Sequence, residues 1–211
     1  SQMKLYTKPG ACSTADHIAL QWAGIPFELE IVTNESRKSP EFVALNPAGA
    51  VPVVVDDDAP GGRFVLTQNA AIMGYIADSA PQAGLMGDGS PRQRAEASRW
   101  LSFVNSDLHP SYTPLFAPGV FVRGAEHYDA VKDLARKHVR KHYETVEARL
   151  AESGGWLAGF RSVADPYLFV TLLWADALGI DTADLRHLSA FRARMQADPG
   201  VQAALKAEGL A

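Results

Sequence analysis

The chain of 211 residues contains a single cysteine, Cys12. One cysteine excludes an internal disulfide, which fits a reducing compartment, so we expect a cytoplasmic protein. No apolar run approaches the roughly 20 residues that span a bilayer, and no charged-then-apolar leader stands near the N-terminus. A formal net charge of −4 gives no reason to expect a nucleic acid or a membrane surface as partner.

The first part of the chain alternates strand-like and helix-like segments. Short apolar or alternating runs predict strands, and apolar residues at helical spacing predict the helices between them. The first strand–helix–strand unit implies parallel strands joined by a right-handed crossover. The last two strands read as a hairpin around an acidic, glycine-rich turn. Expected strands cover 4–7, 27–32, 51–55 and 63–66, and expected helices cover 14–23, 41–44 and 68–78.

The second part of the chain is helical throughout. A stretch rich in proline, glycine and serine separates the two parts and reads as a linker. We therefore predict a small α/β domain at 3–80, a linker at 81–90 and an all-helical domain at 91–211. The expected helices are one from 91 to 104 and onward, bent near Pro110, Pro114 and Pro118, and others at 126–151, 163–178, 184–196 and 200–206.

Cys12 stands where the first strand ends and the first helix begins. A thiol at a helix N-terminus faces unpaired N–H groups and the positive end of the helix dipole, and both favour the thiolate. This position predicts a reactive cysteine. A buried structural cysteine is the alternative reading, because that is the commoner state of a lone cysteine.

Two further segments have the chemistry of a binding site. Val51-Pro52 follows a glycine turn at the start of a strand and is a candidate cis bond, with an ordinary edge-strand proline as the alternative. A cis bond would leave the main chain of Val51 free to pair with a peptide. Gln68 and Asn69 begin a helix, where free N–H groups bind a carboxylate, although simple helix capping is also possible.

Taken together, these segments resemble a bacterial beta-class glutathione transferase along essentially the whole chain. The resemblance implies a thioredoxin-like N-terminal domain that binds glutathione, followed by an all-α helical-bundle domain that carries the pocket for the second substrate. It also implies a homodimer. The motifs that carry it are Pro9-Gly10-Ala11-Cys12-Ser13, Asn46-Pro47-Ala48-Gly49-Ala50-Val51-Pro52, Leu66-Thr67-Gln68-Asn69-Ala70-Ala71-Ile72, Leu108-His109 with Thr113-Pro114-Leu115-Phe116, Ser162-Val163-Ala164-Asp165 and Glu208-Gly209-Leu210.

The resemblance assigns two catalytic residues. Cys12 corresponds to the cysteine beside the glutathione sulfur, and His109 to the histidine that reaches the site from the helical domain. Ser102 and Ser106, one helical turn apart and one or two turns before His109, are expected to face the site.

The resemblance also assigns the residues that hold the tripeptide. The main chain of Val51, held by Pro52, corresponds to the group that pairs with the cysteinyl unit, and Gln68 with Asn69 to the pair that holds the γ-glutamyl end. Gln68 stands where the family usually has Glu, so it offers a neutral hydrogen bond in place of an ionic one. Pro110 stands where a lysine is common.

The function implied is conjugation of the glutathione thiolate to small hydrophobic electrophiles, with glutathione as cosubstrate and no metal. A glutathione-dependent disulfide reductase or peroxidase that works through a Cys12 mixed disulfide is a second hypothesis. A dithiol mechanism is excluded, because Ala15 stands where a second cysteine would be required. A non-enzymatic ligand-binding protein of the same fold is a third.

Overall fold

A four-stranded sheet with strand order β2-β1-β3-β4 forms the first part of the molecule. The computed structural model describes residues 2–211. β1 and β2 are parallel, and β3 and β4 complete the sheet in antiparallel orientation. The predicted parallel unit and hairpin are therefore confirmed. The strands are β1 (Met3–Thr7), β2 (Phe27–Ile31), β3 (Val53–Asp56) and β4 (Phe64–Thr67).

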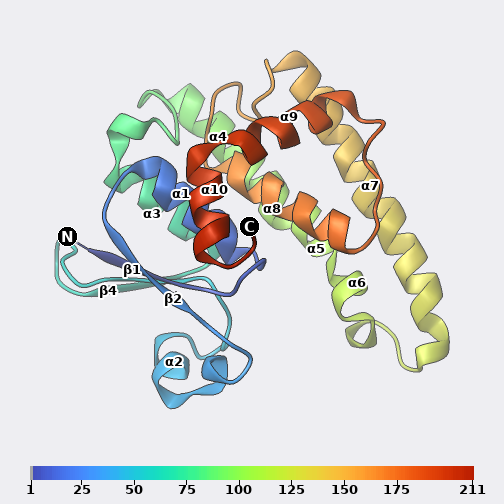
Figure 1. The fold of residues 1–211 in the computed structure, drawn as a ribbon, viewed down its shortest axis with the longest axis horizontal. Coiled ribbons are helices and arrows are strands. Elements are labelled where there is room, and N and C mark those ends of the chain that lie inside the picture. Colours follow the sequence, from blue (N-terminus) through green and yellow to red (C-terminus); the bar gives the residue numbers. More distant parts are fainter. Residues whose placement is uncertain (1) are drawn as a thin grey trace.

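Helices cover both faces of this sheet (Figure 1). Successive side chains of a strand point to opposite faces. Val54 belongs to the large core that includes residues of α1 and α3, whereas Val53 joins Phe42 of α2 in a separate small cluster. Gly24 ends α1 in the left-handed conformation, with φ of 68°, which glycine adopts without steric cost. The three helices are α1 (Ser13–Ala23), α2 (Pro40–Leu45) and α3 (Asn69–Ser79).

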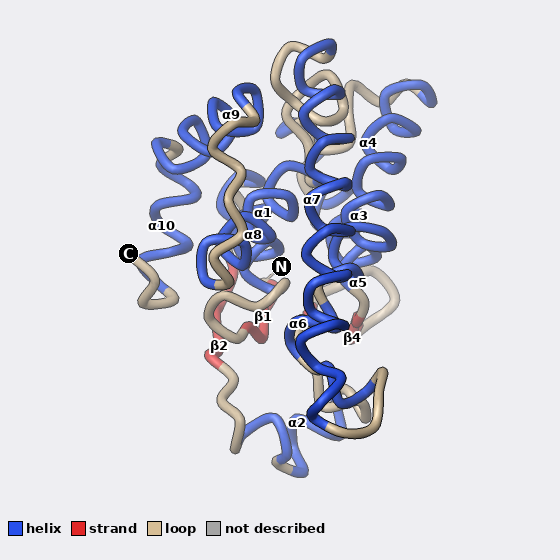
Figure 2. The backbone as a smooth tube through the Cα atoms, turned by 90° about the vertical axis from the view of Figure 1, so that its right-hand side faces the viewer, coloured by secondary structure: helices blue, strands red, loops and turns tan. Residues whose placement is uncertain are grey.

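The second part of the molecule is helical, as predicted. Its central helix α8 is buried along most of its length and contacts both α1 and α4. The long helix α7 runs the full height of this part (Figure 2). The helices are α4 (Pro91–Phe103), α5 (His109–Ser111), α6 (Thr113–Phe116), α7 (Tyr128–Glu152), α8 (Ala164–Ala177), α9 (Arg186–Ala197) and α10 (Pro199–Ala207). Our division into 3–80, 81–90 and 91–211 stays a prediction.

The chain leaves regular α-helical geometry after α4. Residues Val104–Leu108 form a π-helix, in which hydrogen bonds reach one residue further along the chain than in an α-helix. Two short helices, α5 and α6, follow, each with a proline in its first turn. The expected bend near the prolines is therefore present. The π-turn was not expected. It rotates the residues that follow it about the helix axis, relative to their positions in an unbroken α-helix.

The C-terminal segment fastens the two parts together. Helix α10 packs against α1 (Figure 1). The buried carboxylate of Glu208 lies 2.7 Å from Thr14 Oγ1 and 2.6 Å from His17 Nδ1. A carboxylate buried with several hydrogen bonds fixes relative position, because breaking them would leave an unpaired charge in the core.

The turn before α8 is closed by its own side chains. Asp165 accepts a hydrogen bond from the Ser162 backbone N–H at 2.8 Å, and Ser162 Oγ accepts one from the Ala164 N–H at 3.2 Å. Asp165 also accepts from the Leu157 N–H at 3.2 Å. The predicted capping role of this motif is confirmed.

Candidate functional site

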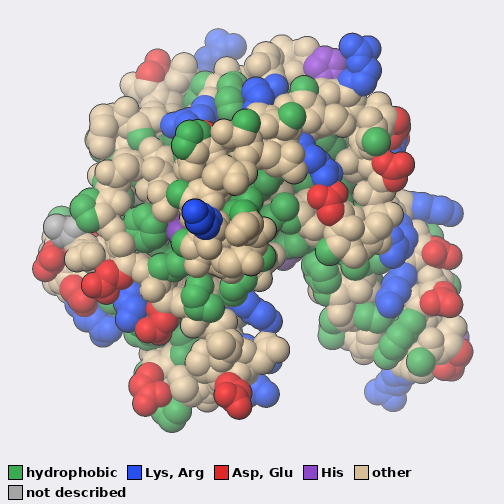
Figure 3. Space-filling model, viewed as in Figure 1, with side chains coloured by type: hydrophobic (Ala, Val, Ile, Leu, Met, Phe, Trp, Pro, Cys, Tyr) green, Lys and Arg blue, Asp and Glu red, His purple; other side chains and the backbone are tan. Residues whose placement is uncertain are grey.

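A cleft of about 370 Å³ opens where the two parts of the molecule meet. Figure 3 shows it as a deep notch between the lobe that carries α2 and the lobe that carries α6. The loop before β3, the start of α3 and the segment around α5 supply its walls. It is lined by Cys12, Asn46, Ala48, Ala50, Val51, Pro52, Thr67, Gln68, Asn69, Asn105, His109, Pro110, Thr113 and Tyr167.

Cys12 lies at the N-cap of α1 and is partly exposed to the cleft. Its Sγ lies 3.9 Å from the Val51 carbonyl oxygen, within reach of a weak S–H hydrogen bond. Burial, with the nearby Asp16 carboxyl as second cause, raises the pKa of Cys12 to about 12. The expectation of a thiolate was therefore wrong. Desolvation and a neighbouring acid outweigh the favourable field of the helix N-terminus.

The loop before β3 presents Val51 and Pro52 to the cleft. The Val51–Pro52 peptide bond is cis, which decides between the two readings of this proline left open by the sequence. Regular strand β3 begins only at Val53, so the main chain of Val51 stands at the cleft rather than inside the strand.

Gln68 and Asn69 both line the cleft but are held differently. Gln68 has φ of 75°, and it is the one non-glycine residue of the described chain with positive φ. Such strain, of order 1–3 kcal/mol, is concentrated at functional sites. Asn69 is only 6% exposed, and its side chain turns inward, with Nδ2 3.3 Å from the Cys12 backbone oxygen.

His109 is held by a tyrosine from α8. Its Nδ1 lies 2.5 Å from the Tyr167 hydroxyl, which donates in turn to Asn105 Oδ1 at 3.3 Å. When the single hydroxyl hydrogen of Tyr167 is directed to Asn105, the contact with His109 is made by the tautomer that carries its hydrogen on Nδ1. In the neutral ring, Nε2 then keeps its lone pair and can accept a proton.

Burial sets the charge states of this pair. It lowers the pKa of His109 below its usual value of 6.5, so the imidazole is neutral at pH 7. It also raises the pKa of Tyr167 far above its usual value, so the hydroxyl keeps its proton. The arrangement is a neutral imidazole whose Nδ1 is hydrogen-bonded to a neutral tyrosine hydroxyl.

Ser102 and Ser106 do not lie among the lining residues. Both are exposed, whereas Asn105 lines the cleft. The prediction assumed an unbroken α-helix up to His109. The π-turn at Val104–Leu108 changes the register, so that Asn105 instead of Ser106 shares the cleft with His109.

Three residues near the site were missed from the sequence. Tyr167 falls in a run of apolar residues and reads as core, and Asn105 is hidden by the unexpected π-turn. Asp16 reads as an ordinary polar residue of a helix, yet it is fully buried one turn after Cys12. For Asp16 the sequence did hold one signal, because a charged residue on the buried face of a helix is unusual and indicates a special role.

A second pocket of about 430 Å³ shares Cys12 and His109 with the cleft. Its other walls include Phe116 and Trp174, whose rings meet edge to face. Trp174 Nε1 donates to the Gly10 carbonyl at 2.7 Å, which holds the indole against the start of α1. An aromatic wall of this kind suits an apolar ligand next to the sulfur.

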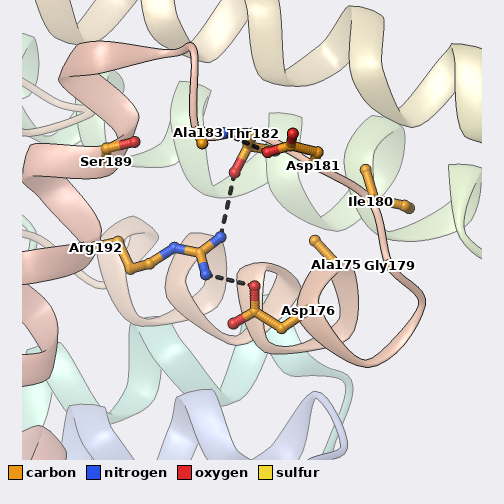
Figure 4. Close-up of a pocket in the computed structure, with 9 residues that line it drawn as sticks. All are labelled: Ala175, Asp176, Gly179, Ile180, Asp181, Thr182, Ala183, Ser189 and Arg192. Atoms are coloured by element: carbon orange, nitrogen blue, oxygen red, sulfur yellow. Dashed lines mark hydrogen bonds and ion pairs between the residues drawn. The ribbon is translucent and has the colours of Figure 1, made fainter.

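A separate cavity of about 470 Å³ lies at the turn between α8 and α9 (Figure 4). Arg192 crosses it, with Nη1 2.5 Å from Asp176 and Nη2 3.2 Å from Thr182 Oγ1. Its cation is therefore already paired. None of the residues proposed from the sequence lines this cavity.

Two observations concern metals and membranes. Within residues 2–211, no group of three or more His, Cys, Asp or Glu side chains is placed to hold a metal ion. None of the helices described is both long enough and apolar enough to cross a bilayer.

A βαβ–ββα sheet domain joined to a helical domain, with a cysteine, a cis-proline and a histidine at the cleft between them, defines a class of glutathione-dependent proteins. Residues 11–79 match the model for the glutathione S-transferase N-terminal domain, and residues 100–199 match that for the C-terminal domain. The chain belongs to the glutathione S-transferase family.

Individual relatives agree with this membership. The chain is 52% identical to glutathione S-transferase GST-4.5 of Xanthomonas campestris pv. campestris, over 99% of this chain and 100% of the relative. A sphingomonad glutathione S-transferase solved with glutathione superimposes with a TM-score of 0.83 at 39% identity, covering 99% and 100% of the two chains. A bacterial beta-class enzyme of Sphingomonas chungbukensis gives 0.82 at 38% identity, with the same coverage. The beta-class resemblance and the expected fold are confirmed.

Proposed function

We propose that this glutathione transferase conjugates glutathione to small hydrophobic electrophiles at the Cys12–His109 cleft. The observation that carries the proposal is that Cys12 and His109 lie together on the wall shared by two pockets, one polar and one aromatic. The polar pocket suits a peptide, and the aromatic pocket suits an apolar partner.

In this proposal the tripeptide lies along the polar pocket. The main chain of Val51 pairs with the cysteinyl unit, next to Pro52, and the strained Gln68 presents its amide to the γ-glutamyl end. The inward turn of Asn69 leaves its backbone N–H, at the start of α3, as the group available to a carboxylate. Ser102 and Ser106 are exposed and do not line this cleft. They could contact glutathione only if it were bound by a second copy of the chain.

His109 then acts as the general base. The glutathione thiol gives its proton to Nε2, while the Nδ1–H bond to Tyr167 keeps the ring in the productive tautomer. The thiolate attacks the electrophilic carbon in the neighbouring pocket, and a carbon–sulfur bond forms as the leaving group departs or the double bond is saturated. Cys12, as a thiol, donates its S–H to the glutathione sulfur.

A Cys12 mixed-disulfide mechanism has less support. The attacking species in thiol–disulfide exchange is a thiolate, and burial raises the pKa of Cys12 to about 12. At neutral pH such a thiol is almost entirely protonated, so it is suited to donate a hydrogen bond and poorly suited to attack. A non-enzymatic role is not favoured either, because the curated relatives carry transferase names.

We further propose a homodimer and a cytoplasmic location. The dimer is supported by large apolar side chains that stay exposed on both parts of the molecule, including Phe64 at 40% and Leu134 at 61%. The location is supported by the lone cysteine. Analytical ultracentrifugation tests the dimer, and a sedimentation coefficient of a 22.7 kDa monomer at micromolar concentration would contradict it.

The test of the function is formation of a thioether adduct from reduced glutathione and an activated aryl halide, followed by mass spectrometry of the product. We expect His109→Gln to lower kcat/KM by about 100-fold or more, as for loss of a general base. His138→Gln is the matched control, because His138 is exposed on α7. An equal loss in both variants, or no adduct with the wild type, would refute the proposal.

A further inference from the structure

A single charged side chain stands in the wall of the aromatic pocket, whose other walls include Phe116 and Trp174. Lys8 lines this pocket, and none of the other residues that line it is Asp, Glu, Lys or Arg. His109, which also lines it, is neutral at pH 7 because burial lowers its pKa. The lining of the neighbouring polar cleft likewise holds no Asp, Glu, Lys or Arg. Within residues 2–211, Lys8 is therefore the only charged residue that lines either pocket.

The main chain of Lys8 is fixed by the residues that begin α1. Its N–H donates to Ser13 Oγ at 3.0 Å, and the Ser13 hydroxyl lies 3.4 Å from the Lys8 carbonyl oxygen. The same hydroxyl lies 2.7 Å from Thr7 Oγ1, at the end of β1. The flexible four-carbon side chain of Lys8 therefore starts from an anchored backbone next to the pocket.

The ammonium of Lys8 has hydrogen-bonding capacity to spare. Its Nζ donates to a neutral amide oxygen, Asn34 Oδ1, at 2.8 Å, and this bond is exposed. In the described part of the chain no carboxylate forms an ion pair with Lys8, whereas Lys4 on β1 pairs with Glu30 at 3.2 Å. Because an ammonium carries three N–H donors, two remain for a ligand at the rim of the pocket.

The surroundings of this cation indicate the chemistry of its partner. A carboxylate or sulfonate accepts charge-assisted hydrogen bonds from an ammonium, and these are roughly twice as strong as neutral ones. The rest of the wall is aromatic: the ring centroid of Trp174 lies 5.6 Å from that of Phe116 and 4.7 Å from that of His109. A flat aromatic ring with one anionic substituent matches both features.

Glutathione also carries carboxylates, but Lys8 lies on the side of the other substrate. Among the lining residues of the described chain, the two pockets share only Cys12 and His109. The groups that the proposed function assigns to the tripeptide belong to the polar cleft, and Lys8 belongs to the aromatic pocket. The charge of Lys8 therefore acts on the ligand of the aromatic pocket.

We propose that Lys8 is a specificity-determining residue that selects aromatic electrophiles carrying an anionic group, such as a carboxylate or a sulfonate. The apolar ring packs against Phe116 and Trp174, and the anionic group meets the Lys8 ammonium at the rim. The inference rests on the proposed function, because that function places the electrophile in the aromatic pocket.

Two activated aryl chlorides of nearly the same shape test the effect of charge. 4-Chloro-3-nitrobenzoate is an anion at pH 7, and 4-chloro-3-nitrobenzamide is neutral. With either compound the glutathione thiol gives its proton to His109, a carbon–sulfur bond forms at the chlorinated carbon, and chloride leaves with the electron pair. The selectivity is kcat/KM for the benzoate divided by kcat/KM for the benzamide. Intrinsic reactivity cancels when this selectivity is compared between protein variants.

We expect Lys8→Gln to lower the selectivity by about 3- to 10-fold, the effect of one charge-assisted hydrogen bond at an exposed site. Lys4→Gln is the matched control, because it removes the same charge from the neighbouring strand, and Lys4 lines neither pocket. Its selectivity should equal that of the wild type. An unchanged selectivity in Lys8→Gln, or an equal fall in both variants, would overturn the proposal.

The KM for glutathione separates this role from binding of the tripeptide. We expect it to change by less than about twofold in Lys8→Gln, since a residue that contacts only the electrophile leaves glutathione binding intact. A rise in this KM with both chlorides, at constant selectivity, would show that the ammonium holds a glutathione carboxylate. That result would overturn the proposal.

Binding without turnover gives a readout that does not need conjugation. 4-Methyl-3-nitrobenzoate and its amide have no leaving group, and calorimetry measures their dissociation constants directly. Lys8→Gln should lose about 3- to 10-fold in affinity for the benzoate relative to the amide, and equal losses would overturn the proposal. If neither chloride gives an adduct but binding is selective in this way, the proposed function fails and the role of Lys8 in selecting an anionic ligand stands.

Discussion

Replacing Tyr167 by Phe tests whether the tautomer of His109 matters. The substitution keeps the ring, which meets His109 edge to face at 5.7 Å, and removes only the hydroxyl. His109 Nδ1–H then lies buried without its partner at 2.5 Å. An unpaired buried donor costs about 1–3 kcal/mol, so the ring favours the other tautomer, which places the hydrogen on Nε2 and removes the base.

That free energy corresponds to a fall in kcat/KM of about 5- to 150-fold for conjugation. Because Tyr167 is not assigned to any part of the tripeptide, the KM for glutathione should change by less than about twofold while kcat carries the loss. Steady-state kinetics of adduct formation at several glutathione concentrations separate the two constants.

Tyr143→Phe is the control for this experiment. Tyr143 is fully buried in the same helical part, and its hydroxyl bonds to Tyr112 at 2.6 Å and to Thr171 at 3.0 Å, away from the cleft. Its loss should lower stability and leave kcat unchanged. Wild-type kcat in Tyr167→Phe, or an equal loss of kcat in both variants, would refute the reasoning.

Three further predictions concern strain, pH and the turn before α8. Gln68→Gly should raise the free energy of unfolding by about 1 kcal/mol in urea titrations, because glycine relieves the positive φ, and should weaken glutathione binding in calorimetry; unchanged binding would exclude the proposed ligand role. Since burial lowers the pKa of His109, kcat/KM should stay level as pH falls to 6.5 and drop only below it; a drop centred above 6.5 would contradict a neutral buried base. Burial raises the pKa of Asp165 to about 7, so the folded state holds a proton that the unfolded chain releases near pH 4. The free energy of unfolding of the wild type, minus that of Asp165→Asn, should therefore fall as pH rises from about 4 to about 7. A value that rises over this range would contradict the raised pKa.

Local sequence patterns were enough to predict the architecture. Period-2 and helical spacing located the strands and the main helices to within a few residues, and the glycine turn before Val51-Pro52 made this bond a candidate for the cis form that the structure shows. These features are set by short-range sterics and by the need to bury one face of each element, so a single sequence contains them.

The chemistry of the site depends on contacts that no local pattern reveals. The pKa of Cys12 is raised mainly by burial, which depends on how the rest of the chain packs around the start of α1, and secondly by the Asp16 carboxyl. The partner of His109 comes from α8, and the π-turn before His109 changed which residue lines the cleft. Helix position alone predicted a thiolate, and long-range packing overruled it.

The most direct test of the account is the ionisation of glutathione when it is bound to the wild-type protein. Its thiolate absorbance can be followed against pH without interference at neutral pH, because Cys12, with a pKa raised to about 12, stays a thiol there. The account predicts that bound glutathione ionises well below the value of about 8.5 for a free thiol. Titration of the mixture at the value of free glutathione would contradict the claim that this cleft binds and activates it.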